Sequence, residues 1–173
     1  SLVMADTDKV RTLYDDAVAN GLEILPPDVN ASNHRFEPVD GRRIRYGLGG
    51  IKGTGEQAVA AIVGARAAGG AFLDLFDFCR RVDKRAVNRR CIEALVRAGA
   101  FDGVNSNRAG LLASAGRAIE AAEQAERSRS QNSLFGESDA AQTAGLVLVE
   151  TPAWDLKQRL TEALSMPMTF ETC

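Results

Sequence analysis

The sequence is poor in the residues from which metal and catalytic sites are usually built. Its 173 residues include one histidine and three cysteines, and the cysteines (Cys79, Cys91 and Cys173) show no Cys-x-x-Cys spacing. Because a zinc site needs about four such ligands, we expect no metal site, and we expect Cys79 and Cys91 to be reduced thiols in a helical core. A Ser-His-acid or Cys-His system would depend entirely on His34, in an expected turn. We therefore predict no catalytic residue and no cofactor in this chain.

Long apolar runs are also absent. No window reaches the ~18 apolar residues of a membrane span, and the N-terminus lacks the layout of a signal peptide. We therefore expect a cytoplasmic protein with no membrane contact. Aromatic residues make up only 6% of the sequence, whereas 45% of its residues are hydrophobic and alanine and glycine are abundant. This composition favours closely packed helices over a sandwich or a barrel.

The charge is nearly balanced over the whole chain but not along it. The formal net charge is −2, which excludes general electrostatic attraction to nucleic acid. Residues 80–97 nevertheless hold seven cations against two anions, and residues 35–52 are also basic. A local basic face on a nearly neutral chain indicates a positioned phosphate contact. The alternative is a solvated helix face with no ligand.

Periodicity and end signals predict a mostly α fold with one small β-hairpin. The hairpin is expected at Asp40-Gly41, between short segments around Phe36 and Ile44, and another extended run is expected at 22–25. Apolar residues at helical spacing place the helices at about 7–20, 56–68, 75–82, 89–98, 107–127 and 154–164. The composition of residues 128–150 (Ser, Gln, Asn, Gly and acids) predicts a flexible linker before the C-terminal helix.

The first candidate binding motif is Lys52-Gly53-Thr54-Gly55, directly before an expected helix. Two glycines let the backbone turn sharply and approach a ligand, and the free N–H groups at the helix start favour an anion. With Lys52 beside them, these residues resemble the hairpin of a helix-hairpin-helix motif, which holds nucleic-acid phosphates. Neither the P-loop nor the dinucleotide-binding glycine pattern is present. The alternative is a glycine-rich turn that binds nothing.

The second candidate is the basic turn between the next two helices. Its spacing from the first motif predicts a repeated helix-turn-helix unit without the Gly-x-Gly, in which Lys84, Arg85 and Arg89 contact phosphates. Two such units could follow the two strands of one duplex, which gives a tandem helix-hairpin-helix bundle.

The third candidate lies in the expected linker, at Gln131-Asn-Ser133-Leu134-Phe135. Adjacent Leu and Phe are costly to expose in a polar segment unless they anchor something. A glutamine amide beside a Leu-Phe pair suits a shallow pocket with an apolar floor. The alternative is that Leu134 and Phe135 pack on the chain's own core.

Together these segments resemble the C family of bacterial replicative DNA polymerases, the alpha subunits of DNA polymerase III. The similarity covers about residues 10–164, and four stretches carry it: Ile24-Leu-Pro-Pro-Asp-Val-Asn30, Ile44-Arg-Tyr-Gly-Leu-Gly-Gly-Ile-Lys-Gly-Thr-Gly55, Leu75-Phe-Asp-Phe-Cys79 and Ala94-Leu-Val-Arg-Ala-Gly-Ala-Phe-Asp102. Residues 166–173 depart from the family pattern, which puts any role for them in doubt.

The resemblance implies a division of the chain into four parts. Residues 1–33 would be the end of the fingers region, residues 34–127 the duplex-binding helix-hairpin-helix domain, residues 128–150 a linker with a motif for the beta sliding clamp, and residues 151–173 a C-terminal helix with an atypical tail. Gln131, Ser133, Leu134 and Phe135 would contact the clamp. The catalytic palm and its Mg²⁺ would lie elsewhere in the parent polymerase, among the other parts of the polymerase III holoenzyme.

Two alternatives stay open. The chain could be a structural connector between polymerase domains with no binding activity of its own. It could also be the equivalent region of an error-prone polymerase paralogue, which the segment at 131–135 makes less favoured.

Overall fold

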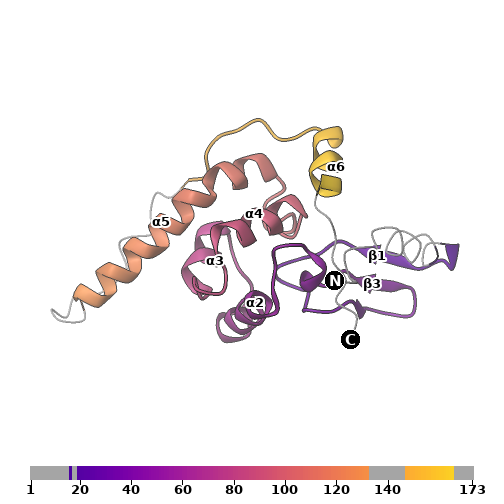
Figure 1. Ribbon diagram of the computed structural model, residues 1–173, viewed down its shortest axis with the longest axis horizontal. Helices are drawn as coiled ribbons and strands as arrows, with labels where there is room; N and C mark the ends of the chain where they lie inside the picture. The colour runs from indigo at the N-terminus through magenta and orange to yellow at the C-terminus, as the bar shows by residue number, and fades with distance from the viewer. Residues whose placement is uncertain (1–15, 17–18, 133–146, 166–173) are drawn as a thin grey trace, which may run out of the picture.

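The structure, a computed structural model, describes residue 16, residues 19–132 and residues 147–165. It is mostly helical with one small sheet, as expected (Figure 1). In chain order its elements are β1 (Glu23–Leu25), β2 (Glu37–Pro38), β3 (Arg43–Arg45), the 3-10 helix η1 (Leu48–Gly50), α2 (Glu56–Gly69), α3 (Leu75–Arg81), α4 (Arg89–Arg97), α5 (Arg108–Asn132) and α6 (Leu156–Ser165). The expected helix at 7–20 falls mainly outside the described residues.

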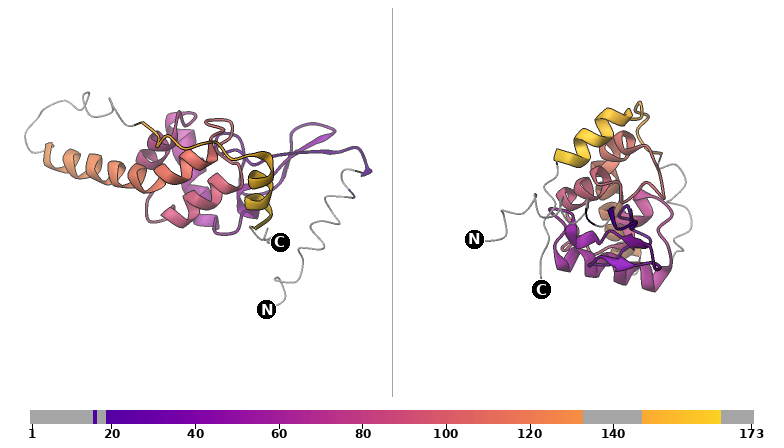
Figure 2. Two further views of the ribbon diagram at one scale, coloured as in Figure 1. Left: turned by 90° about the horizontal axis from the view of Figure 1, so that it is seen from above. Right: turned by 90° about the vertical axis from the view of Figure 1, so that its right-hand side faces the viewer.

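The sheet forms at one end of the molecule, and α5 extends toward the opposite end (Figure 2). The antiparallel pair β2–β3 is the hairpin expected at Asp40-Gly41. The Asp40 carboxylate accepts hydrogen bonds from the N–H groups of Arg42 and Arg43 at 2.9 Å, and these bonds and the Arg43 side chain lower its pKa. The third strand was not expected to join: β1 pairs with β3 in parallel, with Ile24 opposite Ile44.

The core lies among α2, α3, α4 and α5, with α5 packed across both α3 and α4. Its centre is a row of three aromatic rings in edge-to-face contact. The Phe72 and Phe78 ring centroids lie 4.9 Å apart, and those of Phe78 and Phe101 lie 5.0 Å apart. A chain with few aromatic residues therefore concentrates them at the junction of α3 with the turn after α4.

Side-chain caps begin two of the helices, and glycines end two of them. Asn88 caps α4 by accepting a hydrogen bond from the Cys91 N–H at 3.0 Å, and Asp74 caps α3 through the Asp77 N–H at 2.7 Å. The chain leaves α2 through Gly70 at φ 76° and passes the end of α4 through Gly99 at φ 83°, a left-handed region that favours glycine. These ends fix the direction of each turn.

Three arginines are part of the scaffold because their guanidinium groups bind backbone carbonyls. Arg66 donates to the carbonyls of Val29 and Ser32 at 3.1 and 3.0 Å, which ties the segment after β1 to α2. Arg81 donates to three carbonyls around the end of α2, and Arg108 donates to the carbonyl of Arg97. These cations are not available to a ligand.

One expectation about the C-terminal part needs correction. The Ala-rich helix does not end near Arg127: α5 continues to Asn132, so the first residues assigned to the linker are helical. Residues 133–146 of the predicted linker, including Ser133, Leu134 and Phe135, lie outside the described residues. Residues 147–150 are described, and the Val149 N–H donates to the Ser114 hydroxyl of α5 at 2.7 Å. The C-terminal helix forms as α6, but Leu156 and Leu160 are 72% and 53% exposed. It is held instead by Arg97–Glu162 and Arg159–Asp102 ion pairs at 3.2 and 3.0 Å.

No helix in the described part of the chain is both long and apolar enough to cross a membrane. The tail at 166–173 lies outside the described residues.

Replacing Phe78 with alanine should destabilise the fold strongly, because the side chain is fully buried between two other rings. We expect a loss of about 3–5 kcal/mol in the free energy of unfolding, measured by urea denaturation. Leu73→Ala is the control, since Leu73 is 80% exposed, and it should change stability by less than about 0.5 kcal/mol. Equal losses for the two variants would contradict this description of the core.

Candidate nucleic-acid interface

The strongest candidate site is hairpin 1, which we define as Ile51–Gly55. It connects η1 to α2, and the Thr54 N–H closes it by donating to the Ile51 carbonyl at 3.0 Å. Ile51 and Thr54 are buried, whereas Lys52, Gly53 and Gly55 are exposed. The hairpin therefore has an inner side anchored in the core and an outer side that faces solvent.

Gly53 makes the turn possible. Its φ of 94° is in a region that other residues rarely adopt, and a Cβ built on it would lie 3.7 Å from the Ala94 Cβ of α4. Hairpin 1 thus packs directly on α4.

The Thr54 hydroxyl of hairpin 1 lies beside the Cys91 thiol of α4. Burial raises the pKa of that thiol to about 11, and the Thr54 hydroxyl opposes part of that rise through a weak interaction with the sulfur. Among the described residues the Thr54 hydroxyl has no acceptor at full hydrogen-bond distance.

The start of α2 offers a row of unused donors. Gly55 is its N-cap and supplies no side-chain cap, and the first bond of the helix runs from the Val59 N–H to the Gly55 carbonyl. Within the described part of the chain, no acceptor is found for the N–H groups of residues 55–58. These donors and the positive end of the helix dipole favour an anion beside Lys52. Glu56 is the one acidic side chain in the first turn.

Hairpin 2, which we define as Val82–Asn88, is built differently. It has no glycine, and Asp83 organises it. The Asp83 carboxylate accepts from the Arg85 N–H at 2.9 Å, and its carbonyl accepts from the N–H groups of Ala86 and Val87. Because these three amides already have partners, hairpin 2 cannot present them to phosphate as hairpin 1 presents its own.

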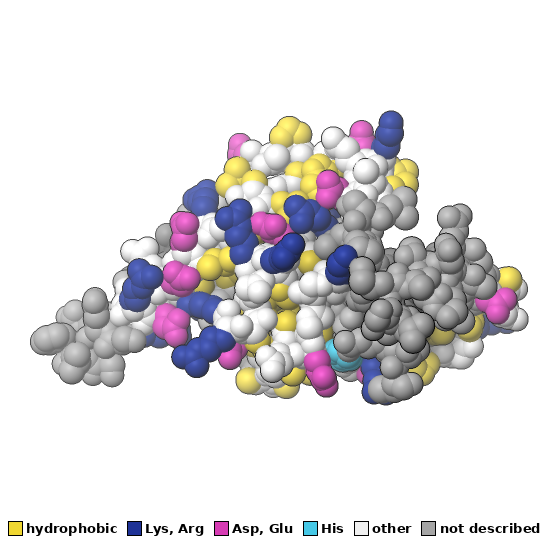
Figure 3. Space-filling view, in the orientation of Figure 1, with side chains coloured by type: hydrophobic (Ala, Val, Ile, Leu, Met, Phe, Trp, Pro, Cys, Tyr) yellow, Lys and Arg dark blue, Asp and Glu magenta, His cyan; other side chains and the backbone are white. Residues whose placement is uncertain are grey.

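The cations predicted around hairpin 2 have different environments. Lys84 is ion-paired with Glu126 of α5 at 2.7 Å, and the hydrogen bond from Lys84 lowers the pKa of that carboxyl. Arg89 is ion-paired with Glu93 at 2.8 Å. Arg85 is exposed. Figure 3 shows that Lys and Arg side chains alternate with acidic ones over α3, α4 and α5 and do not form a continuous basic surface.

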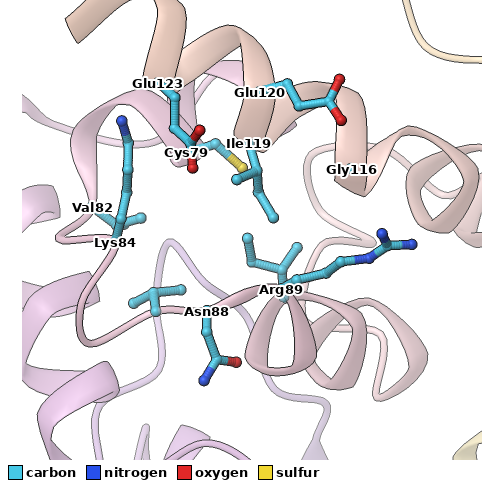
Figure 4. Close-up of a pocket in the computed structure, with 11 residues that line it drawn as sticks. Cys79, Val82, Lys84, Asn88, Arg89, Gly116, Ile119, Glu120 and Glu123 are labelled. Atoms are coloured by element: carbon cyan, nitrogen blue, oxygen red, sulfur yellow. The ribbon is translucent and has the colours of Figure 1, made fainter. Parts of the chain in front are cut away.

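A groove separates hairpin 2 and the start of α4 from α5, with a volume of about 320 Å³ (Figure 4). Its floor is apolar, and its rim carries Lys84 and Arg89 on one side and Glu120 and Glu123 on the other. Cys79 lies in this groove with a pKa that burial raises to about 12. A thiol with this pKa stays protonated at neutral pH, so Cys79 is not activated as a nucleophile.

The third candidate motif is only partly described. Gln131 lies in the last turn of α5, whereas Ser133, Leu134 and Phe135 lie outside the described residues. The prediction that residues 131–135 form a binding motif therefore rests on the sequence.

The sequence pattern that defines the helix-hairpin-helix motif matches residues 21–111. The chain belongs to the helix-hairpin-helix family. The matched segment contains both hairpins, η1 and α2–α4, so the recurrence of helix, turn and helix expected from the sequence is confirmed.

Curated relatives extend this result. The chain is 46% identical over 157 residues to the DNA polymerase III subunit alpha of Neisseria meningitidis serogroup B, which covers 91% of the chain and 14% of that protein. It is 48% identical over 150 residues to the Pseudomonas aeruginosa subunit and 44% identical over 135 residues to the Escherichia coli K12 subunit, each covering 77% of the chain and 13% and 12% of the relative. The resemblance stated from the sequence is thus confirmed. The chain spans about one seventh of the length of the curated relatives it matches.

Replacing Gly53 with alanine should destabilise the protein, because alanine at φ 94° is strained although the space beside Ala94 would hold a methyl group. We expect a loss of about 1–2 kcal/mol in the free energy of unfolding. The matched control is Gly64→Ala in α2, where φ is ordinary and the position is open. It should raise stability by about 0.5–1 kcal/mol. Thermal denaturation of the pair checks this, and a stabilising Gly53→Ala would contradict the assigned turn.

Proposed function

We propose that this chain is a non-catalytic module of a replicative DNA polymerase that holds duplex DNA by its backbone, without sequence specificity. The observation that carries the proposal is the row of unpaired N–H groups at the start of α2, beside the exposed Lys52. Phosphate is the anion that this arrangement suits, since backbone donors, a helix dipole and a point charge converge on one exposed position. The similarity to DNA polymerase III alpha subunits points to DNA as the source of the phosphate.

Lack of sequence specificity follows from the same geometry. The donors are backbone groups of a tight turn, and no long side chain of hairpin 1 other than Lys52 extends from it. Base edges are read by side chains that enter a groove, whereas backbone donors contact phosphates. The parent protein would be a DNA-directed DNA polymerase whose Mg²⁺-dependent palm lies outside this chain, and we assign this chain no catalytic residue and no cofactor.

We further propose that residues 131–135 bind the beta sliding clamp. Gln131 lies in the last turn of α5, and residues 123–129 before it have no buried side chain. A short motif binds weakly alone, but attachment to a domain already on DNA raises its effective concentration. The connector hypothesis differs from both proposals because it requires neither partner to bind the isolated chain.

The duplex proposal predicts that affinity falls steeply with salt and is the same for unrelated sequences. Lys52→Glu should weaken binding to every duplex and reduce the slope of log K against log salt by about 0.9, measured by fluorescence anisotropy. Lys157→Glu on α6 is the control with the same charge change and should keep the slope. Gly55→Ser should also weaken binding, because its hydroxyl would cap the amides offered to phosphate. A slope near zero for the unmodified chain, or no mobility shift of a labelled duplex, would favour the connector hypothesis.

The clamp proposal predicts that Leu134→Ala combined with Phe135→Ala abolishes capture of the chain by the purified ring while duplex binding is unchanged. The reason is the loss of two apolar anchors from one small pocket. Leu156→Ala combined with Leu160→Ala removes two other exposed leucines and should leave capture intact. Undiminished capture of the first double variant in surface plasmon resonance would refute this assignment.

A further inference from the structure

Two adjacent arginines at the start of α4 point to different neighbours. Successive helical residues project about 100° apart, so Arg89 and Arg90 occupy different edges of the helix. The sequence marks both as part of one basic run. The contacts that α4 makes with its neighbours show that Arg89 and Arg90 lie on different edges of the helix.

One edge of α4 contacts hairpin 1. Gly53 lies against Ala94, where a Cβ would meet the Ala94 Cβ at 3.7 Å, and Thr54 interacts with the Cys91 side chain. Arg90 is one helical turn before Ala94, and residues four apart share a face. Arg90 is exposed, so its side chain extends toward solvent on the side of α4 that carries hairpin 1.

The other edge of α4 contacts α5. Arg89 and Ile92 line the groove against that helix, and a Cβ built on Gly116 would lie 3.5 Å from an Arg89 guanidinium nitrogen. Figure 4 shows Arg89 in this groove with Asn88 and Gly116. On a helical projection the hairpin-1 edge (Cys91 and Ala94) and the groove edge (Arg89 and Ile92) lie about 160° apart. Arg89 is therefore directed away from hairpin 1.

The ion-pair environments of the two arginines also differ. Arg89 shares Glu93 with Arg97, at 2.8 and 3.8 Å. Arg90 is exposed, and the structure shows no ion pair for it among the described residues. A cation that already has a carboxylate partner must give it up to bind phosphate, whereas Arg90 has no such partner in the described part of the chain.

We infer that Arg90, and not Arg89, is the second cation of the phosphate site at hairpin 1. It binds the same DNA strand as Lys52 and the amides of α2, and its guanidinium contacts two oxygens of one phosphate or two neighbouring phosphates. The inference rests on the proposed duplex binding and names a residue that the sequence reasoning did not select. It also assigns the contact to the side of α4 that carries hairpin 1.

The test compares Arg90→Gln with Arg89→Gln in the same chain, by anisotropy with a labelled duplex over a series of salt concentrations. Arg90→Gln should weaken binding roughly tenfold and lower the salt slope by about 0.9. Arg89→Gln should leave both within error. Arg90→Lys, which keeps the charge but not the planar fork, should keep the slope and lose part of the affinity. Equal thermal unfolding midpoints confirm that the variants are folded.

The outcomes separate the inference from the proposed function. If the unmodified chain binds with a steep salt slope and Lys52→Glu weakens it, while Arg90→Gln binds normally, then Arg90 is not in the site and duplex binding stands. An effect of Arg89→Gln as large as that of Arg90→Gln also overturns the inference. If the unmodified chain shows no salt-dependent binding, both the inference and the proposed function fail.

Discussion

The contact of hairpin 1 with α4 is the constraint on which the rest of the candidate interface depends. Gly53 and Thr54 pack against Ala94 and Cys91, and this fixes which side of the turn is buried. The opposite side then carries Lys52 and the unpaired amides of α2. The arrangement has a cost, since burying a hydroxyl without a full hydrogen-bond partner lowers the free energy of unfolding by about 1–3 kcal/mol. The burial of Ile51 and Thr54 in a close-packed core offsets that cost and keeps the donors in one orientation.

The same structure shows why a count of positive charges in the sequence overestimates the number of cations available to bind phosphate. The cations divide into three groups by their partners. Arg66, Arg81 and Arg108 bind carbonyls that helix ends and turns leave open. Others, such as Lys84, are paired with acids. The charge that remains for a ligand is set by exposed cations for which the described residues offer no such partner. Lys52 and Arg90 are of this kind on the hairpin-1 side of α4. Guanidinium groups suit the first role because their fork of donors can satisfy several carbonyls at once.

Local signals predicted most of the fold. The Asn88 cap, the glycines at 70 and 99, the Asp40-Gly41 hairpin and the glycine pair of hairpin 1 each act within a few residues, so their patterns could be recognised in the sequence. Contacts between residues far apart in the chain could not be predicted in this way. The pairing of β1 with β3 and the Lys84–Glu126 contact join residues far apart in the chain. The end of α5 was misplaced for another reason. The serines and asparagine after Arg127 have weak helix preference and suggested a linker, but the helix continues through them to Asn132.

The form of α5 connects the two proposed activities. Its 25 residues make a rod of roughly 37 Å. Residues 123–129 have no buried side chain, and this end of α5 projects from the domain (Figure 1). Beyond the Lys84–Glu126 ion pair, such a segment has little packing to hold it and opens at little free-energy cost. Gln131 lies in the final turn of α5, so a partner that requires an extended Gln131 has to unwind that turn. The rod would separate a ring-shaped partner from the duplex surface without weakening the domain that holds the DNA.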